Sequence, residues 1–378
     1  MVGWSTSRLA FPDPGKVTDL RKVLRARLDE GINVVADCDL VTGGTGLLGS
    51  HIAERLVTQG RRVRALVRPG SQTAFLRSLG VELFEGNLAD PDSCARGVRG
   101  VKNLYHAAAK VGDWGRWSEF QTDCIDATTN LGQAALREGV ARFLHISSTS
   151  AYGHPRDQRE PIDETAAMGQ NLWIWDSYTR SKVECERVLW NLAESSRLPV
   201  TVIRPSWLYG ERDRTTVARL VDRLRMGKVP TIGPGDNPMS AVYAGVVADA
   251  ALLGANDPGS VGEAYNITNH GWITQRDFLN LFAEACGAPR VRRKVPYRLA
   301  YNASFLLEAH GRLTRRPRPP LITRYATWLM GRWLEYSTEK ARTRLGWEPA
   351  LSYRESIERS VQWYLESESI PTLASPTA

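Results

Sequence analysis

The sequence has few cysteines and no long hydrophobic stretch. Five cysteines occur among 378 residues, an odd number with no CxxC pair, so neither a disulfide framework nor a zinc site or other metal site is expected. Nowhere do about 18 apolar residues follow one another, and no segment is expected to span a membrane. The first twenty residues carry charges and lack the apolar core of a secretory signal. These absences favour a cytoplasmic protein.

Charge of one sign gathers at only one place. The net charge of +8 is spread along the chain, except for a basic, proline-rich patch containing Arg312, Arg315, Arg316 and Arg318. We interpret this patch as a solvated loop, in preference to a site for an anionic partner or a membrane surface. We expect a small-molecule substrate and no nucleic-acid partner.

Strand-like and helix-like segments alternate through the first half of the chain. Before residue 39, apolar residues at helical spacing predict one accessory helix, the N-terminal extension of residues 1–38. From residue 39 to 205, the runs DLVTGG, RVRALV, VELFEGN, LYHAAA, RFLHISS and VTVIRP alternate with amphipathic segments. Parallel strands need helical crossovers, so this alternation predicts an α/β fold with a doubly wound parallel sheet, the Rossmann fold.

The alternation weakens after residue 205. Residues 206–239 and 269–366 contain separate amphipathic helices and are expected to form a smaller, mostly helical substrate-binding lobe. Residues 240–268 are expected to return to the first domain, with short strands near Ala241 and Ala264 that join the sheet. Residues 367–378 are polar and are expected to form a flexible tail.

A glycine-rich turn follows the first predicted strand. The segment TGGTGLLG places Gly43, Gly46 and Gly49 at three-residue spacing between a strand and a helix. Small residues let the backbone approach a pyrophosphate, while a helix N-terminus supplies free N–H groups. The turn predicts a dinucleotide site, in which Leu47 and Leu48 begin the phosphate-binding helix.

The end of the second strand bears on the choice of dinucleotide. An acidic residue there binds the 2′-hydroxyl of NAD, but RVRALV is followed by Arg68. A guanidinium favours a 2′-phosphate, so NADP(H) is preferred and NAD(H) stays open.

Tyr178 and Lys182 lie four residues apart at the start of a predicted helix, and therefore on one face. A free tyrosine, with a pKa of about 10, is a poor base at neutral pH. An ammonium group one turn away stabilises a phenolate by about 3–4 kcal/mol. The spacing thus predicts a proton donor and acceptor, and the upstream strand RFLHISS brings serines to a sheet end where ligands bind.

The ordered motifs TGGTGLLG, LYHAAA, HISSTSAYG, YTRSK and IRPSWLYG resemble the extended short-chain dehydrogenase/reductase family over roughly residues 39–366. The resemblance implies that Ser148 binds the substrate oxygen, that Tyr178 is the acid/base and that Lys182 also holds the nicotinamide ribose. Thr149 replaces Ser148 if the register slips by one. The remaining residues that it implies at the cofactor are Asn87, Leu88, Ala107, Ala108, Ala109, Pro205 and Ser206. It also implies a homodimer, since family members often pair.

Three positions depart from the family pattern. Cys124 stands where an asparagine usually begins its motif, which puts in doubt the backbone kink and proton relay attributed to that asparagine. Asn87 replaces an aspartate at the adenine-contacting strand end and keeps an acceptor. Gly245 and Val246 stand where carboxylates are common, so their lobe-packing role is absent.

The family includes several reactions. Thr149 and Ser150 stand where sugar dehydratases have an acid pair, which disfavours that activity, and Trp207 stands near the place of a sugar-binding asparagine.

Apolar residues that could line a pocket are Trp173, Ile174, Trp175, Leu321, Ile322, Tyr325, Trp328 and Leu329; Trp207 and Tyr243 are further candidate substrate residues. The stretch near Pro320–Trp333 resembles the 3β-hydroxysteroid dehydrogenase branch. We therefore expect an oxidoreductase for an apolar, sterol-like or 3-oxo substrate. The alternatives are a nucleotide-sugar epimerase with tightly bound NAD and a non-catalytic dinucleotide sensor.

Overall fold

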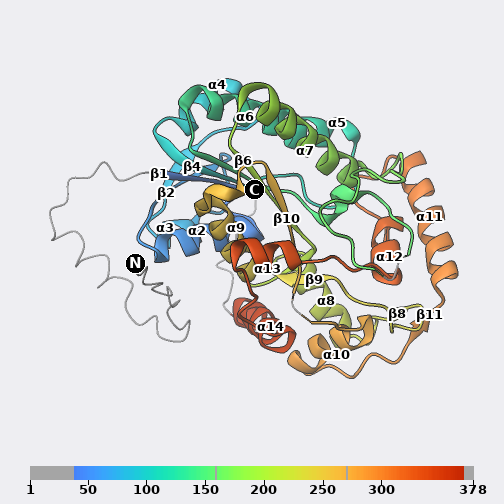
Figure 1. Ribbon diagram of the computed structural model, residues 1–378. Coiled ribbons are helices and arrows are strands. Elements are labelled where there is room, and N and C mark those ends of the chain that lie inside the picture. Colours follow the sequence, from blue (N-terminus) through green and yellow to red (C-terminus); the bar gives the residue numbers. More distant parts are fainter. Residues whose placement is uncertain (1–37, 158–159, 270, 370–378) are drawn as a thin grey trace, which may run out of the picture.

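The computed structural model describes residues 38–157, 160–269 and 271–369. The helix expected within residues 1–38 and most of the expected tail lie outside the described residues. Seven parallel strands form the central sheet in the order β10-β6-β5-β4-β1-β2-β3 (Figure 1). They are β1 (Cys38–Thr42), β2 (Arg62–Val67), β3 (Glu82–Glu85), β4 (Val101–His106), β5 (Arg142–Ile146), β6 (Val200–Pro205) and β10 (Glu263–Ile267).

The strand order reverses at β1. This strand pairs with β2 on one side and β4 on the other, so the connections that follow β1 and β4 diverge and open a crevice at the carboxyl ends of the strands. All five residues of β1 are buried. Burial on both faces explains the continuous apolar runs in the sequence, and the predicted doubly wound sheet is confirmed.

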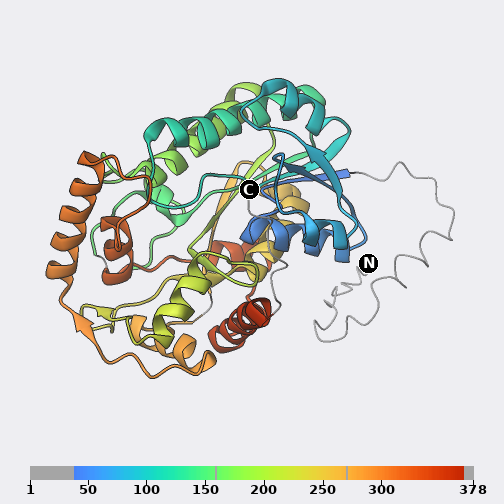
Figure 2. The ribbon, with the colours of Figure 1, turned by 180° about the vertical axis from the view of Figure 1, so that it is seen from behind.

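Helices cover both faces of the sheet (Figures 1 and 2). One layer contains α4 (Pro91–Val98), α6 (Ala127–Glu138) and α7 (Ser177–Ser196); the other contains α2 (Leu47–Thr58), α3 (Ala74–Ser78), α9 (Ala244–Asn256) and α13 (Glu339–Leu345). Leu131 and Leu189 belong to the apolar core of the first layer. Ile52 and Val247 belong to the core of the second. The sheet therefore holds α2 and α7, which begin at the expected cofactor and catalytic residues, on opposite faces.

The remaining elements form the lower and right-hand parts of Figure 1. They are β7 (Trp207–Tyr209), α8 (Thr216–Arg225), β8 (Thr231–Ile232), β9 (Ala241–Tyr243), α10 (Gln275–Ala285), β11 (Lys294–Val295), α11 (Tyr297–Leu313), α12 (Arg324–Gly331) and α14 (Tyr353–Ser369). Helices α8, α10 and α14 pack together, and α11 packs on α12. Short elements are α5 (Trp117–Phe120), the π-helix η2 (Gln121–Asp126), and the 3-10 helices η3 (Thr149–Tyr152) and η4 (Pro258–Ser260).

The strand at Ala241 differs from expectation. Ala264 in β10 joins the central sheet beside β6, but β9 pairs with β7 in a separate two-stranded sheet. The physical reason is that β10 takes the edge of β6 along its length, from Thr201 to Pro205. Only the continuation of the chain beyond Pro205 is left for β9 to pair with.

The described residues also bear on membranes and metals. None of the helices in the described part of the chain combines the length and the apolar character that crossing a bilayer requires. The five cysteines are buried and free. Across residues 38–157, 160–269 and 271–369, no group of three or more His, Cys, Asp or Glu side chains is arranged to hold a metal ion.

Candidate active site

The glycine turn is too tight for side chains at two positions. Gly43 has φ +71°, and a Cβ there would lie 2.7 Å from the Ala108 nitrogen. A Cβ on Gly49 would lie 2.2 Å from the Gly43 oxygen. The Gly46 amide donates to that same oxygen at 2.9 Å. The glycines thus let the turn lie against the end of β4 and against the first turn of α2.

The start of α2 suits an anion. Gly46 is its N-cap and makes no side-chain capping hydrogen bond, so the first backbone N–H groups of the helix are left for a ligand. Thr45 and Gly46 are exposed, whereas Leu48 is buried. The backbone of this turn, and not the leucine side chains, therefore fits a dinucleotide pyrophosphate.

Other expected cofactor residues follow the carboxyl ends of β3, β4 and β6. The Ala107 and Ala108 amides each lie 3.3 Å from an oxygen of Thr42, which holds the end of β4 beside the glycine turn. Asn87 is exposed after β3, and its Oδ1 accepts from the Ala89 amide at 3.0 Å. Ser206 is buried, with its hydroxyl donating to Thr268 at 2.9 Å.

Arg68 immediately follows β2 and is exposed. Among the described residues its guanidinium makes no hydrogen bond or ion pair to another side chain. Its N–H groups are therefore available to an anion.

The structure distinguishes the consecutive hydroxyl residues that follow β5. Ser147 is buried and donates to Glu186 Oε1 at 2.5 Å. Ser148 is only half-buried, and its Oγ accepts from the Ser150 amide at 3.1 Å. Thr149 is 5% exposed and forms a hydrogen bond with Tyr336. Burial raises the pKa of the Tyr336 phenol to about 12, and the hydrogen bond with Thr149 opposes this rise. Of the three, Ser148 is the one left to meet a substrate.

Tyr178 and Lys182 occupy the first two turns of α7. Lys182 is 6% exposed, and its Nζ donates to the Ile146 carbonyl at 3.0 Å. Burial and, second, the charge of Lys182 lower the pKa of His106 to about 3, so this imidazole stays neutral at neutral pH. The lysine is therefore the cation at the base of the site, one turn from the half-buried Tyr178.

A buried ion-pair network fixes α7 against the sheet. Glu186 is fully buried and accepts from Arg204 Nη2 at 2.6 Å. Arg204 also donates to the Tyr152 hydroxyl at 3.0 Å. Ser147, which precedes Ser148, completes the connection to β5. Glu186 lies one helical turn after Lys182. The network therefore fixes the part of α7 that carries Lys182 against β5 and β6. Sequence reasoning missed both charged members of this network.

A second pair joins the serine loop to the tyrosine helix. The His154 ring lies 2.8 Å from Asp176 Oδ2 and stacks 3.8 Å from Trp173. Asp176 is the N-cap of α7 and accepts from the Thr179 amide at 2.9 Å. Both members of the pair are buried. An aspartate before a helical run is a recognised N-cap signal that could have singled out Asp176 from the sequence.

We expect Asp176→Ala to lower the free energy of unfolding by about 2–4 kcal/mol. The substitution removes the N-cap of α7 and leaves the buried His154 without its hydrogen-bond partner. Chemical denaturation measures this loss. Asp163→Ala is the matched control. Asp163 also caps a turn, because it accepts a hydrogen bond from the Thr165 amide at 2.9 Å, but this hydrogen bond is exposed. Equal losses in the two variants would contradict a linking role for Asp176.

The cysteine at the family's asparagine position lies in a distorted helix. Cys124 is 2% exposed within the π-helix η2, and its sulfur accepts from the Lys110 amide at 3.3 Å. π-helical turns often mark functional sites. The helix is therefore π-helical here without the asparagine, and the doubt about the proton relay stays as the sequence left it.

The expected substrate residues do not all gather near Tyr178. The Tyr325 ring lies 6.1 Å from the Tyr178 ring, and Trp175 is partly exposed three residues before it. Trp207 instead packs on Phe278 at 5.9 Å. Tyr243 is 2% exposed, and its hydroxyl donates to Glu211 at 2.5 Å.

The placement of these two side chains corrects the expectation. Trp207 and Tyr243 belong to the packed region that includes Phe278, so both are left out of the substrate site proposed below. Trp328, 3% exposed, is likewise a core residue. The reason for the first two is that β7 and β9 pair with each other, and that Trp207 contacts Phe278 of α10 while Tyr243 contacts His51 of α2.

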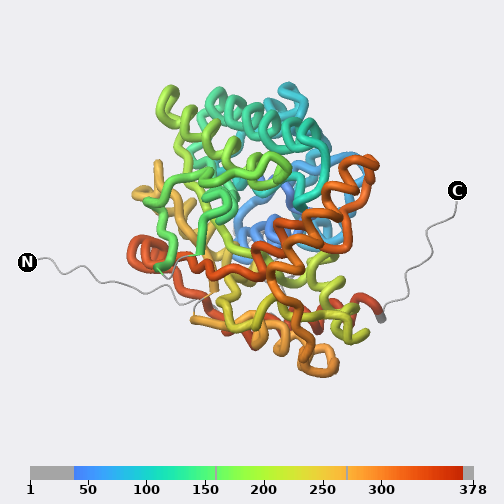
Figure 3. Tube along the Cα trace, turned by 90° about the vertical axis from the view of Figure 1, so that its right-hand side faces the viewer, coloured from blue at the N-terminus to red at the C-terminus, as the bar shows by residue number. Residues whose placement is uncertain are grey.

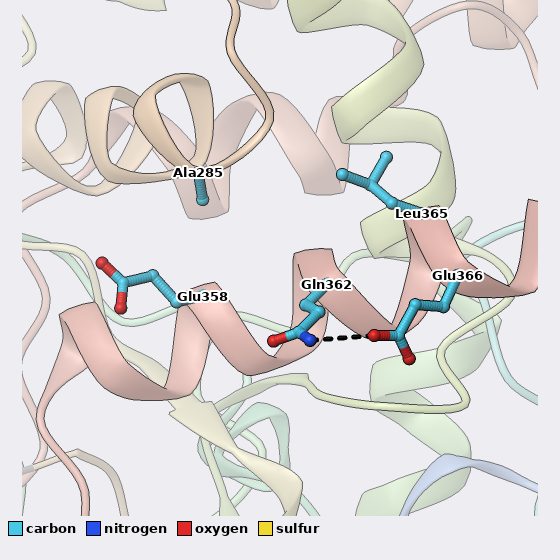
Figure 4. A pocket seen from close by; sticks show the side chains of 5 residues that line it. All are labelled: Ala285, Glu358, Gln362, Leu365 and Glu366. Atoms are coloured by element: carbon cyan, nitrogen blue, oxygen red, sulfur yellow. Dashed lines mark hydrogen bonds between the residues drawn. The ribbon is translucent and has the colours of Figure 1, made fainter.

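Two surface hollows lie apart from the expected catalytic residues. One, of about 440 Å³, lies between α10 and α14 (Figure 4). It is lined by Ala285, Glu358, Gln362, Leu365 and Glu366. Its carboxylates would repel a phosphate, and its walls contain no residue of the crevice. The second, of about 290 Å³, includes Thr268 and Tyr336, which form hydrogen bonds with Ser206 and Thr149, respectively.

Comparisons with known proteins agree with this geometry. Residues 40–268 match the model of the NAD dependent epimerase/dehydratase family. A 2-alkyl-3-oxoalkanoate reductase from Stenotrophomonas maltophilia is 30% identical over 325 residues, 85% of this chain and 97% of that protein. The decarboxylating sterol-4-alpha-carboxylate 3-dehydrogenase of Mus musculus is 26% identical over 353 residues, 90% of this chain and 94% of that protein.

A solved structure shows the same fold. The UDP-glucose 4-epimerase of Thermotoga maritima matches with a TM-score of 0.70 at 22% identity, covering 88% of this chain and 99% of that one. At this identity the likeness concerns the fold alone. The family match spans more than half of the chain, and the dinucleotide turn and the Tyr178–Lys182 helix are both in place. The chain therefore belongs to the NAD dependent epimerase/dehydratase family and is an NAD(P)-dependent enzyme of the extended short-chain dehydrogenase/reductase type, nearest its 3β-hydroxysteroid dehydrogenase-like branch.

Proposed function

We propose that this enzyme is an NADP(H)-dependent oxidoreductase that interconverts a secondary alcohol and a ketone on an apolar substrate. The observation that supports the proposal is that Tyr178 and Lys182 share the first two turns of α7, where the buried Lys182 donates to the Ile146 carbonyl, two residues before the half-buried Ser148. Residues 206–239 and 269–366 form the substrate-binding lobe in this proposal.

Each of the three residues has a distinct task. Ser148 donates a hydrogen bond to the substrate oxygen and orients it. Tyr178 gives a proton to that oxygen in reduction and takes it back in oxidation. Lys182 stabilises the phenolate that Tyr178 becomes when it has given up its proton. The nicotinamide cofactor supplies or accepts the hydride.

The cofactor fits the crevice through backbone and side-chain groups of this chain. The first N–H groups of α2 bind the pyrophosphate, and the glycine turn leaves room for it. Arg68 binds the 2′-phosphate that distinguishes NADP from NAD. Pro205 and Ser206 flank the nicotinamide, and Asn87 lies at the adenine.

Arg68→Asp is expected to shift the ratio of NADP to NAD affinity by at least about tenfold toward NAD, because a carboxylate repels the 2′-phosphate and binds the 2′-hydroxyl. Fluorescence titration with both cofactors measures the ratio. Arg77→Asp is the control, since Arg77 is a surface arginine on α3 that interacts with Thr73. An unchanged ratio in Arg68→Asp refutes the NADP assignment.

Aromatic neighbours of Tyr178 favour an apolar substrate. Tyr325 lies against it, and Trp175 stacks on Phe305 of α11 at 5.6 Å. The two relatives described above are named for a 3-oxo acid and a sterol carboxylate. A ligand held by such rings gains chiefly from burial of apolar surface.

Nicotinamide absorbance tests the proposal against epimerisation. With a panel of 3-oxo acids and 3-hydroxysterols, the enzyme should consume or produce reduced cofactor in proportion to product. With nucleotide sugars, it should produce neither net redox change nor an epimer. Epimer formation without a change in absorbance at saturating sugar would establish the alternative, a nucleotide-sugar epimerase, and overturn this proposal.

A further inference from the structure

Helix α11 carries its leucines on the outside of the molecule. Its buried residues form one face that packs toward α12: Ala300, Ser304, Glu308 and Gly311. On the opposite face Leu299, Leu306 and Leu313 are 62%, 67% and 84% exposed. Their seven-residue spacing, two helical turns, places them in one stripe. Figure 1 shows α11 along the outer edge of the molecule, and Figure 3 shows it on the side turned toward the viewer.

Apolar residues from other segments extend this stripe toward Tyr178. Ile174 is 82% exposed, and its neighbour Trp175 stacks on Phe305 in the middle of α11. Val111 is 81% exposed, three residues before Trp114, whose indole N–H donates to the Arg316 carbonyl at 3.1 Å. The segments containing Ile174 and Val111 therefore border α11.

The charge around the stripe has one sign. Arg298, Arg315, Arg316 and Arg318 are exposed. Between residues 296 and 324 the only acidic residue is Glu308. Glu308 is 5% exposed and accepts from the Arg324 amide at 3.0 Å, so its carboxylate faces the protein. Within residues 296–324 the exposed surface thus combines leucines with arginines and carries no exposed carboxylate.

We propose that the α11 face, meaning α11, the basic loop after it and the apolar residues Val111 and Ile174, docks on an anionic lipid surface. The leucines enter the acyl boundary, and the arginines meet the lipid phosphates. A convex amphipathic helix with a basic rim is typical of proteins that lie in a membrane interface. A second copy of the chain fits poorly, because this face against itself would oppose arginine to arginine. For these arginines the sequence favoured a solvated loop over a site for a membrane surface, and the proposal takes the second interpretation.

Docking there has a consequence for the enzyme. The α11 face extends to Ile174 and to its neighbour Trp175, which lie four and three residues before Tyr178. If the proposed apolar substrate is correct, the docked enzyme takes it from the lipid phase beside the catalytic helix. The docking itself does not depend on that function, and its test measures no turnover.

Co-sedimentation of the full chain with vesicles tests the proposal. Vesicles of phosphatidylcholine alone are compared with vesicles that contain about a third phosphatidylglycerol, in low salt and in about 0.5 M salt. We expect binding to the anionic vesicles that weakens at least about tenfold in high salt. The triple variant Leu299→Ser, Leu306→Ser, Leu313→Ser should lower the partition coefficient at least about tenfold. The triple variant Arg315→Gln, Arg316→Gln, Arg318→Gln should remove most of the salt dependence.

The control variant is Met226→Ser with Val261→Ser. These residues are 58% and 47% exposed on other surfaces, so their loss should leave vesicle binding unchanged. Thermal melting of each variant checks that it is folded. Absence of binding to anionic vesicles in low salt overturns the proposal, as does a leucine variant that binds like the parent. A parent dimer that becomes a monomer in the leucine variant, seen by light scattering, would assign the face to a second copy instead.

Discussion

Tyr178→Phe is expected to lower turnover by about 10²–10⁴-fold, because it removes the phenolic proton and leaves the ring in place. The ring packs on Tyr325 and on the apolar cluster around Phe120, and phenylalanine preserves both contacts. Cofactor affinity should stay within about threefold, since the glycine turn and Lys182 are untouched. Turnover is measured by nicotinamide absorbance and cofactor affinity by fluorescence titration.

The matched control is Tyr325→Phe. Burial and, second, the neighbouring Tyr178 raise the pKa of Tyr325 well above its usual value, so its phenol stays protonated and cannot serve as the base. Removal of that hydroxyl should change turnover only severalfold. Unchanged turnover in Tyr178→Phe would rule out the proposed proton transfer. A loss of cofactor binding together with turnover would point to a structural role for Tyr178.

The largest effect on stability is expected from Glu186→Ala, at about 3–5 kcal/mol in the free energy of unfolding. The substitution leaves the Arg204 guanidinium buried without its counter-ion and leaves Ser147 without its acceptor. Because α7 also carries Tyr178 and Lys182, turnover should fall even below the melting transition. Denaturant unfolding measures the free energy, with an unchanged slope showing that the unfolded state is the same.

Glu184 provides the control on the same helix. It pairs with Arg187 at 2.7 Å, and both side chains are exposed. Ion pairs at the surface contribute little to stability. Glu184→Ala should therefore change the free energy of unfolding by about 0.5 kcal/mol or less. The double variant Glu186→Met, Arg204→Met should regain much of the loss, because no buried charge remains unpaired. If Glu186→Ala cost no more than Glu184→Ala, the network would not be what holds α7.

Local patterns in the chain predicted the parts of the site that depend on neighbouring residues. The three-residue spacing of Gly43, Gly46 and Gly49 places them in one turn, and the four-residue spacing of Tyr178 and Lys182 places them on one helical face. Ser148 was identified only by resemblance. The structure supports its choice over Ser147, because alternation along the strand end turns Ser147 toward Glu186.

Patterns that depend on distant partners misled the sequence reasoning. The strand at Ala241 reads as a member of the main sheet, but β10 occupies that edge. Tyr243 was taken for a substrate residue, yet Glu211 and the core hold it.

The sequence alone determined that the chain folds as a doubly wound sheet and where its phosphate-binding turn and Tyr178–Lys182 helix lie, because strand period, helix period and turn chemistry are local properties. Only the tertiary structure decided what supports them: the contact of Glu186 with Arg204, the tie between His154 and Asp176, and the outward stripe of α11. Those pairings join segments far apart in the chain, and their burial depends on which edges and faces the rest of the fold has already covered.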